Sequence, residues 1–413
     1  MKKIPLNELV RKVGSFGDAT LIGIGPMSSN VVESCFELAK LYRFPLMFIA
    51  SRNQIDKKEL GGGYVNGWDQ FDFVNAIEKI AQKNSFYDYY VCRDHGGPWQ
   101  RDEERNAHLE LDQAMKIAKE SFISDIEAGF DLIMVDPTKD PFTMGKVVDL
   151  DFVLEKTVEL IEFCEQERKR RKIGVIAYEV GTEETNGGLT QVETYNVFLE
   201  KLNKELKRRG LPTPLFAVGQ TGTLVKSTRQ AGIFNYQNAK ILTDMAKTHG
   251  VYLKEHNADY LDSASLALHI PAGITAVNVA PQFGYVETKS YLSLCMIEDE
   301  LLKNGAIASK SNLYAVLLEN AIKIGRWKKW VSEEDGLKSY GEILEDKKLA
   351  REILEIAGHY VLDVDVVKNE VGKLFANLNS CNIDGKEFVK DHIKASIMEY
   401  ITCFNMKYIL DRL

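Results

Sequence analysis

Two histidines occupy equivalent positions in the sequence, each beside an acidic residue at the end of a short apolar run. His95 follows Asp94 at the end of residues 89–95, and His256 follows Glu255 near the end of residues 251–257. Two imidazoles and a carboxylate make an open site for Zn²⁺, or for a similar divalent ion such as Mn²⁺, that leaves room for substrate oxygens. The plainer interpretation is that each histidine is a polar cap at its strand end.

Asp94 adds a second chemical role, proton transfer, beside the metal site proposed for the two histidines. A base beside a metal-bound carbonyl or hydroxyl can move a proton that is otherwise too weakly acidic. Because adjacent residues at a strand end point apart, Asp94 can handle protons while His95 binds the metal. Gly96 and Gly97 follow directly, and they let the backbone come close to a ligand.

Polar residues also end the other apolar runs. Those that we expect near the same site, as substrate-binding groups or as further carboxylates, are Asn53, Gln54, Asp136, Glu179, Glu183, Glu184, Gln220 and Asn257. The glycine-containing segments 61–64 and 219–223 could bind an anion through backbone N–H groups, although plain turns are the alternative. Lys226, Arg229 and Lys289 could add positive charge there, or lie on the surface.

Eight apolar runs of strand length carry these residues, and helical patterns separate them. The runs are 19–25, 45–51, 89–95, 132–138, 172–181, 215–222, 251–257 and 276–281. The helical segments are 30–42, 69–82, 109–128, 150–170, 192–208 and 238–248, with a short helix at 261–269. Eight strands alternating with helices predict a parallel (β/α)₈ (TIM) barrel, with its site at the carboxyl ends of the strands. An open doubly wound sheet is the competitor, but the first turn lacks GxGxxG.

The residues after the eighth run look entirely helical. Helical spacing covers 286–303, 311–330, 341–357, 362–378 and 386–411. With no linker rich in Pro, Gly or Ser, we expect a barrel over 1–305 and a packed helical extension over 306–413. We interpret the remaining histidines, His108, His249, His269, His359 and His392, as structural. Trp327 and Trp330 are interpreted as packing of the extension.

Composition bounds the function. The 413 residues carry a net charge of −8, which argues against nucleic-acid binding, and 45% are apolar, ample for a large core. The six cysteines include no CxxC pair, which argues against disulfides or a cysteine zinc site. The N-terminus does not resemble a signal peptide, and no apolar run approaches membrane-spanning length. We therefore expect a cytoplasmic protein that binds no membrane.

Several motifs together resemble a known family. In order they are SRNQI, GGGY, RDHGGP, EAGFDLIMVDPT, GTEETNGG, KEHNADY, VNVAPQF and DGKEFVKDHIKASIMEYITCF. They are similar to the larger, so-called non-catalytic subunit of class II D-tagatose-1,6-bisphosphate aldolases, over nearly the whole chain. Related barrels resemble metal-dependent epimerases of ketoses or ketose phosphates.

The resemblance implies roles for particular residues. Asp94 becomes the proton-transfer residue, and His95 and His256 become metal ligands. Glu183 becomes a ligand or a second acid/base, with Glu184 as the shifted alternative. Catalytic class II aldolases bring a third histidine to the metal, whereas this sequence offers Gln220 at the end of the sixth run.

Three functions follow as hypotheses. The first is an epimerase of a ketose or ketose phosphate, inverting carbon 4 by retro-aldol cleavage and re-addition, or carbon 3 through an enediolate. The second is a non-catalytic subunit that stabilises a separate class II aldolase chain. The third is an aldolase acting alone, which the missing histidine disfavours. For each we expect a sugar or sugar-phosphate ligand and a homo-oligomer.

Overall fold

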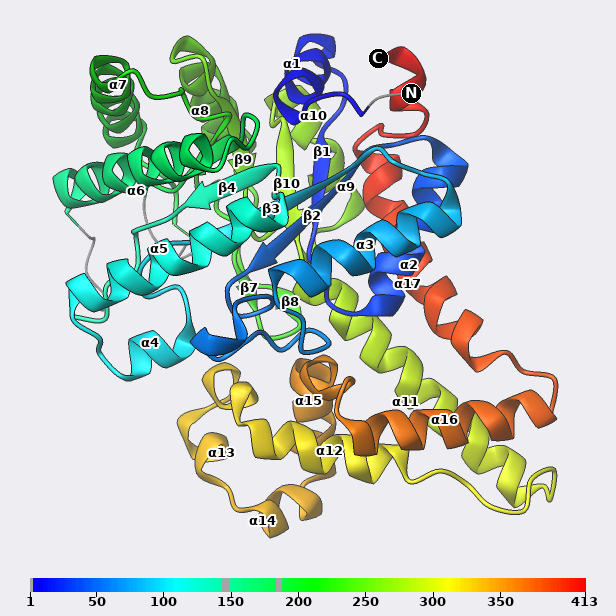
Figure 1. Cartoon of the computed structure of the whole chain (residues 1–413). Helices are drawn as coiled ribbons and strands as arrows, with labels where there is room; N and C mark the ends of the chain where they lie inside the picture. The colour runs from blue at the N-terminus through cyan, green and yellow to red at the C-terminus, as the bar shows by residue number, and fades with distance from the viewer. Residues whose placement is uncertain (1–2, 143–148, 183–187) are drawn as a thin grey trace.

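Eight parallel strands close into a barrel, which confirms the predicted TIM fold (Figure 1). The computed structural model describes residues 3–142, 149–182 and 188–413, so Glu183 and Glu184 lie outside the described residues. Around the barrel the strand order is β1-β10-β9-β6-β5-β4-β3-β2. The strands are β1 (Leu21–Ile24), β2 (Leu46–Ser51), β3 (Tyr89–Gly96), β4 (Leu132–Val135), β5 (Ala177–Val180), β6 (Phe216–Val218), β9 (Tyr252–Glu255) and β10 (Ala276–Val279).

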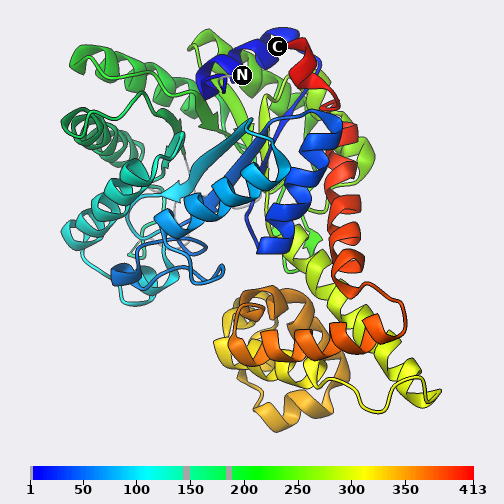
Figure 2. The same ribbon diagram turned by 45° about the vertical axis from the view of Figure 1, so that its right-hand side comes forward.

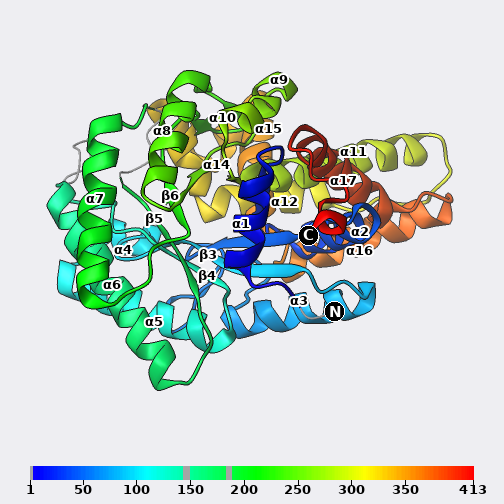
Figure 3. The ribbon, with the colours of Figure 1, turned by 90° about the horizontal axis from the view of Figure 1, so that it is seen from above.

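Helices surround this barrel, as the view from above shows (Figure 3). The larger ones are α2 (Ser29–Tyr42), α3 (Gln70–Asn84), α5 (Leu111–Ala128), α6 (Leu150–Arg170), α7 (Val192–Arg209), α8 (Tyr236–Thr248) and α11 (Pro281–Lys303). Local sequence fixes their ends. Asp69 forms a capping box with Asp72 at the start of α3, and Gly129 and Gly210 end α5 and α7 with positive φ.

Every residue of β1, β4, β5 and β10 is buried. These strands lie between the barrel interior and the helices, so both of their faces avoid water, and this explains why they read as continuous apolar runs. In the described residues, no helix combines the length and apolar character needed to cross a membrane.

Some predicted boundaries differ from the structure. The fifth strand is shorter than 172–181, because only Ala177–Val180 pairs with its neighbours. The predicted helix at 261–269 is two short helices, α9 (Ser263–Ala267) and α10 (His269–Ala272). Small elements that were not predicted include α1 (Leu6–Phe16), α4 (Asp102–Asn106), and the hairpin of β7 (Val225–Lys226) and β8 (Arg229–Gln230).

Residues 313–380 form a separate group of helices, called the annex below, which faces the carboxyl ends of the strands (Figure 2). It contains α12 (Leu313–Ile324), η2 (Arg326–Trp330), α13 (Glu333–Leu337), α14 (Tyr340–Glu345), α15 (Lys347–Ala357), η3 (Gly358–Val361) and α16 (Asp365–Ser380). The long helix α11 leads from the barrel into it.

The chain then returns to the barrel. Helix α17 (Gly385–Cys403) packs against α2 and α11. Beyond it, Phe404 accepts a hydrogen bond from the backbone N–H of Thr20 (3.1 Å), and Arg412 pairs with Asp18 (2.9 Å). The last described residues therefore lie beside α1 and β1, where both chain ends appear in Figure 1.

Candidate functional site

His95, from β3, and His256, directly after β9, face each other at the carboxyl rim of the barrel. Nε2 of His95 lies 3.3 Å from Nδ1 of His256. The other nitrogen of each ring contacts a carboxylate: Nδ1 of His95 lies 2.7 Å from Asp136, and Nε2 of His256 lies 2.9 Å from Glu179. An ionised carboxylate only accepts hydrogen bonds, so each ring N–H points at its carboxylate and the two lone pairs point at each other.

This arrangement fits a divalent cation. Two facing lone pairs repel unless a proton or cation lies between them. Tetrahedral Zn²⁺ with Zn–N bonds of about 2.0–2.1 Å separates two nitrogens by about 3.3 Å, which is the distance between His95 and His256. Asp94 completes a triad whose ligand atoms all lie within 4.8 Å of one another. Carboxylates that hold the outer N–H groups are typical of histidine metal sites.

Charge around the pair keeps both supporting carboxylates ionised. Burial raises the pKa of Glu179, but Lys254, at 2.6 Å, and His256 outweigh it and bring that pKa down to about 2. Burial likewise raises the pKa of Asp136, and the hydrogen bond from His95 outweighs it, again to about 2. For His95 itself, burial lowers the pKa, while Asp94 and Asp136 raise it by more.

An irregularity in β3 places Asp94 and His95 on the same cavity. The register with β4 shifts between Arg93 and Gly96, and His95 has a positive φ of 44°. A bulge re-aims the side chains that follow it, so the expectation that these two neighbours point apart is wrong. Because Gly96 and Gly97 lack side chains, this segment can lie close to the end of β4: a Cβ on Gly97 would lie 2.5 Å from the carbonyl oxygen of Asp136.

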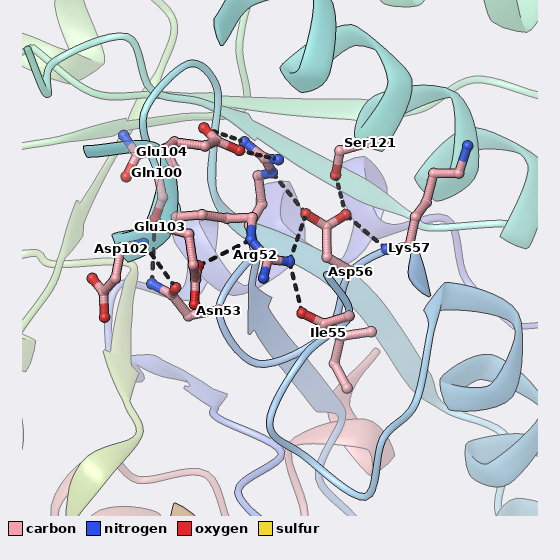
Figure 4. Close-up of polar contacts among 12 residues, drawn as sticks. Arg52, Asn53, Ile55, Asp56, Lys57, Gln100, Asp102, Glu103, Glu104 and Ser121 are labelled. Atoms are coloured by element: carbon pink, nitrogen blue, oxygen red, sulfur yellow. Dashed lines mark hydrogen bonds and ion pairs between the residues drawn. The ribbon is translucent and has the colours of Figure 1, made fainter. Parts of the chain in front are cut away.

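Buried ion pairs fix the loops beneath the site (Figure 4). Arg52, at the end of β2, donates to Asp56 (3.0 Å) and to Glu104 of α4 (2.7 Å), and all three are buried. Ser121 of α5 donates to the same Asp56 (2.7 Å). Because breaking such a buried pair leaves an uncompensated charge, these contacts hold the loops after β2 and β3 in one arrangement.

Two cavities adjoin the His pair, and His95 lines both. One, of about 250 Å³, lies between the rim and the annex and is lined by Asp94, His95 and Asn257 among others. The second, of about 350 Å³, is lined by His95, His256 and Asp136 among others. Trp330 of the annex lines both. The annex residues that line the first cavity, called the annex wall below, are Arg326, Lys329, Trp330, Glu355, Ile356, His359 and Tyr360.

The sequence-predicted polar residues fall into different places. Asn53, Gln54 and Asn257 line the first cavity. Asn53 also holds the loop after β3, donating to Gln100 (3.2 Å) and accepting from the N–H of Asp102 (3.2 Å). Asp136 lies behind His95, as its hydrogen-bond partner.

Gln220 and the segment around it lie deeper. Its backbone N–H donates to Thr190 (2.7 Å), and residues 219–223 are all buried. Neither of the two cavities counts Gln220 among its lining residues. Glu255, the acidic neighbour of His256, accepts from Thr221 (2.6 Å) and lies 3.3 Å from His269, away from the pair.

Several residues that contact or line the site were not predicted from the sequence. Lys254 and Asn278 were not singled out, although Lys254 neutralises Glu179 and Asn278 donates to Asp94 (2.9 Å). For Asn278 the signal was present, since it lies on a strand in an otherwise apolar run, whereas Lys254 is followed directly by the polar residues 255–257. His359 and Trp330 were interpreted as structural or packing residues, and that interpretation is incomplete because both line the cavity. Trp327 is fully buried, as expected of packing.

The comparisons with known proteins agree on the architecture. The sequence matches the D-tagatose-1,6-bisphosphate aldolase subunit GatZ/KbaZ-like family over residues 6–402. A crystal structure described as a probable tagatose 6 phosphate kinase from Sinorhizobium meliloti 1021 is similar at a TM-score of 0.75 and 17% identity, covering 93% of this chain and 100% of that one.

Two enzymes are more distant structural neighbours. The fructuronate-tagaturonate epimerase UxaE from Cohnella laeviribosi has a TM-score of 0.57 at 11% identity, covering 95% of this chain and 82% of its own. A fructose-bisphosphate aldolase from Campylobacter jejuni has a TM-score of 0.50 at 12% identity, covering 92% and 95%. At such identities these likenesses support the fold and carry no statement about activity.

Proposed function

The chain belongs to the D-tagatose-1,6-bisphosphate aldolase subunit GatZ/KbaZ-like family, and on that premise we propose that it is a metal-dependent epimerase of a ketose or ketose phosphate. The observation that carries the proposal is the facing pair of His95 and His256, each fixed from behind by a carboxylate, with His95 open to a cavity of about 250 Å³. A sugar needs a cavity of this kind, close to a site that can polarise its carbonyl.

His95 and His256 are the described residues proposed to hold the cation, while Asp94, whose ligand atom also lies within 4.8 Å of theirs, is kept for proton transfer beside it. The nitrogen-rich set favours Zn²⁺, with Mn²⁺ as a further candidate. When bound, it would polarise the sugar carbonyl and a neighbouring hydroxyl. Glu183, expected from the sequence as a ligand or second acid/base, stays a proposal because it lies outside the described residues.

Asp94 is the proposed base. Asn278 donates to one of its oxygens at 2.9 Å, which orients the carboxylate while it lines the cavity. For inversion at carbon 3, Asp94 removes the carbon-bound proton, and an acid on the opposite face, proposed as Glu183, returns one. For inversion at carbon 4, Asp94 removes the hydroxyl proton, the bond between carbons 3 and 4 breaks, and re-addition takes place on the other face of the aldehyde.

The other polar residues of the cavity are proposed to bind sugar hydroxyls. Asn53, Gln54 and Asn257 line it from the loops after β2 and β9. Asp136 acts through His95, which it orients, and so counts as a positioning residue. Gln220, expected from the sequence to bind substrate, lines neither cavity, and we propose that it supports the segment at Thr190, with which its backbone exchanges hydrogen bonds.

The test is metal analysis of the purified chain, followed by NMR with fructose 6-phosphate, tagatose 6-phosphate and the two free ketoses, with and without added Zn²⁺ or Mn²⁺. We expect a bound cation and metal-dependent appearance of the epimeric ketose with the unaltered chain. In Asp94→Asn we expect the cation to be kept and turnover to be absent or strongly reduced. A triose product would point to an aldolase. A chain with neither metal nor turnover would contradict the proposal.

A second candidate rests on the family description, which names an aldolase subunit. In that role the chain supports a separate class II aldolase, and its own site is not used. Mixing the chain with such an aldolase distinguishes the two. Asp94→Asn that still raises the partner's activity as much as the unaltered chain favours the supporting role.

A further inference from the structure

A third cavity, of about 790 Å³, lies between the glycine-rich segment 61–63 and the annex. It adjoins the first cavity, since Tyr64, Asp102, Arg326 and Lys329 line both. Its charged lining residues are six cations and two carboxylates, a net charge of +4: Arg101, Arg105, Lys139, Arg326, Lys328 and Lys329 against Asp102 and Glu103. Such a cluster is notable in a chain whose net charge is −8.

Arg326 is held in place without using its donors. Its guanidinium lies over the rings of Tyr64 and Tyr360, at 5.1 and 5.3 Å from their centres. The side chain is only 18% exposed, and its nearest carboxylates, Asp102 and Glu103, are 3.8 and 3.9 Å away, too far for a hydrogen bond. Among the described residues it makes no side-chain hydrogen bond. A guanidinium that is stacked on two rings, and whose carboxylate partners lie beyond hydrogen-bond distance, still has N–H groups for an acceptor from outside the chain.

Two other arginines of this cavity are already engaged. Arg101 donates to the carbonyl of Gly62 (2.6 Å), and Arg105 donates to the carbonyl of Trp99. These two arginines form one side of the third cavity. The glycine-rich segment can pack against the loop after β2 only because it lacks side chains, since a Cβ on Gly63 would lie 1.9 Å from the carbonyl of Gln54. Arg326 and Lys329 line both cavities, and their ion pairs with Asp102 are longer, at 3.8 and 3.5 Å, so they are the groups placed to bind a ligand that extends from one cavity to the other.

We propose that the annex supplies a phosphate-monoester subsite in which Arg326 and Lys329 bind the phosphate of a ketose phosphate whose carbonyl end lies at the His pair. This rests on the proposed function and narrows it to phosphorylated substrates. The forked guanidinium matches two phosphate oxygens, and Lys329 adds a second charge to a dianion. A neutral ketose offers no group that needs this concentration of cations.

In the described residues, the loops where TIM barrels often bind phosphate do not offer an alternative phosphate site. Residues 219–223 are buried and engaged in internal hydrogen bonds, and Lys226 and Arg229 lie exposed on the β7–β8 hairpin. Neither of these two cations lines the first or the third cavity. The annex thus takes over a task that commonly falls to the loops of the last strands.

The experiment compares the unaltered chain with Arg326→Met, Lys329→Met and the double variant, and uses Lys323→Met, an exposed annex lysine outside these cavities, as the matched control. Binding of inorganic phosphate is measured by calorimetry, and kcat/KM is measured on fructose 6-phosphate, on fructose and on the 6-carboxylate analogue. For the double variant we expect phosphate binding to be lost and kcat/KM on fructose 6-phosphate to fall roughly 100-fold, because two charge-assisted contacts disappear. Activity on fructose should change less than about twofold, and Lys323→Met should change nothing.

Three results would overturn the subsite. The first is unchanged phosphate affinity in the double variant, and the second is an equal loss on fructose and fructose 6-phosphate. The third is a larger loss on the 6-carboxylate analogue, which would assign the cavity to a carboxylate. Partial recovery in Arg326→Lys controls for folding. If the unaltered chain turns over no sugar yet binds phosphate through Arg326, the subsite stands and the proposed function fails.

Discussion

The first cavity has a barrel side, formed by the strand ends and their loops, and an annex side, formed by the annex wall. The polar groups of these two sides find their hydrogen-bond partners in different ways. On the barrel side, His95 contacts Asp136, and His256 contacts Glu179, which in turn pairs with Lys254. On the annex side, Arg326 makes no side-chain hydrogen bond among the described residues, and neither ring nitrogen of His359 has a partner. The two facing imidazole nitrogens of the barrel side suit the proposed cation, whereas the groups of the annex side suit the proposed ligand with several oxygens.

His359 makes the contrast plain. It is 5% exposed, it lines the first cavity, and burial, with a smaller contribution from Arg326, lowers its pKa to about 3. The ring is therefore neutral and offers one donor and one acceptor that the protein leaves unused. Buried polar groups without partners are costly, and at a cavity they mark the place where a ligand completes the structure.

The largest expected effect comes from breaking the barrel side. His256→Ala removes one of the facing nitrogens, so we expect stoichiometric metal to be lost and turnover to fall by roughly 1,000-fold or more, since a polarising cation supplies several kcal/mol. Metal analysis and NMR turnover measure both. His249→Ala, at a helix end and bonded to Asn196, should keep metal and activity. Full metal occupancy in His256→Ala would contradict the assignment of the site.

A buried acid on α11, the helix that joins the two sides, tests what an unpartnered group costs. Glu287 is 1% exposed, one of its oxygens has no partner, and burial raises its pKa to about 7 despite hydrogen bonds from Ser28 and Asn30. A pKa raised on folding gives stability below the unfolded value near 4.5 that is lost as pH rises through about 7, roughly 3 kcal/mol in all.

Glu287→Gln should remove this loss. Denaturant unfolding from pH 5 to 8 should give a flatter stability profile for the variant than for the unaltered chain. Taking the difference between the two chains cancels the contribution of Asp259, whose pKa burial also raises to about 7. Parallel profiles for the two chains would show that Glu287 does not titrate in this range.

Weakening one support on the barrel side should have a moderate effect. Asp136→Asn keeps an acceptor for Nδ1 of His95 and removes the charge behind it, so we expect metal affinity to fall about 10- to 100-fold without loss of the fold. Titration against a competing chelator measures this. An unchanged affinity would mean that Asp136 orients His95 without strengthening it as a ligand.

The smallest expected effect lies on the annex side. His359→Phe keeps the ring and removes both unpartnered nitrogens, so thermal stability should stay the same or rise. KM for the sugar should increase about tenfold, the value of one or two hydrogen bonds, while metal content stays constant. A lower melting temperature with an unchanged KM would make His359 structural, as the sequence first suggested.

The difference between the barrel side and the annex side also explains which parts of the site could be predicted from the sequence. Apolar runs and equivalent strand ends place His95, His256 and Asp94 together, because in a barrel all carboxyl ends of parallel strands meet at one rim. The annex residues of the cavity were not predicted, because helical periodicity shows which face of a helix is packed but does not show which part of the molecule that face packs against. His359 and Trp330 therefore read as core, and the pairing of Lys254 with Glu179 required the register of strands far apart in sequence.

The return of α17 to the barrel has a consequence for biosynthesis. The last barrel strand ends at Val279, yet the helix that packs over α2 and α11 begins only at Gly385. A ribosome must therefore release the whole annex before the barrel's outer layer is complete, and until then α2 lacks one of the helices that pack against it. In the sequence the annex is one continuous segment between α11 and α17, so substitutions that reshape the annex wall of the cavity leave the residues of the barrel rim unchanged.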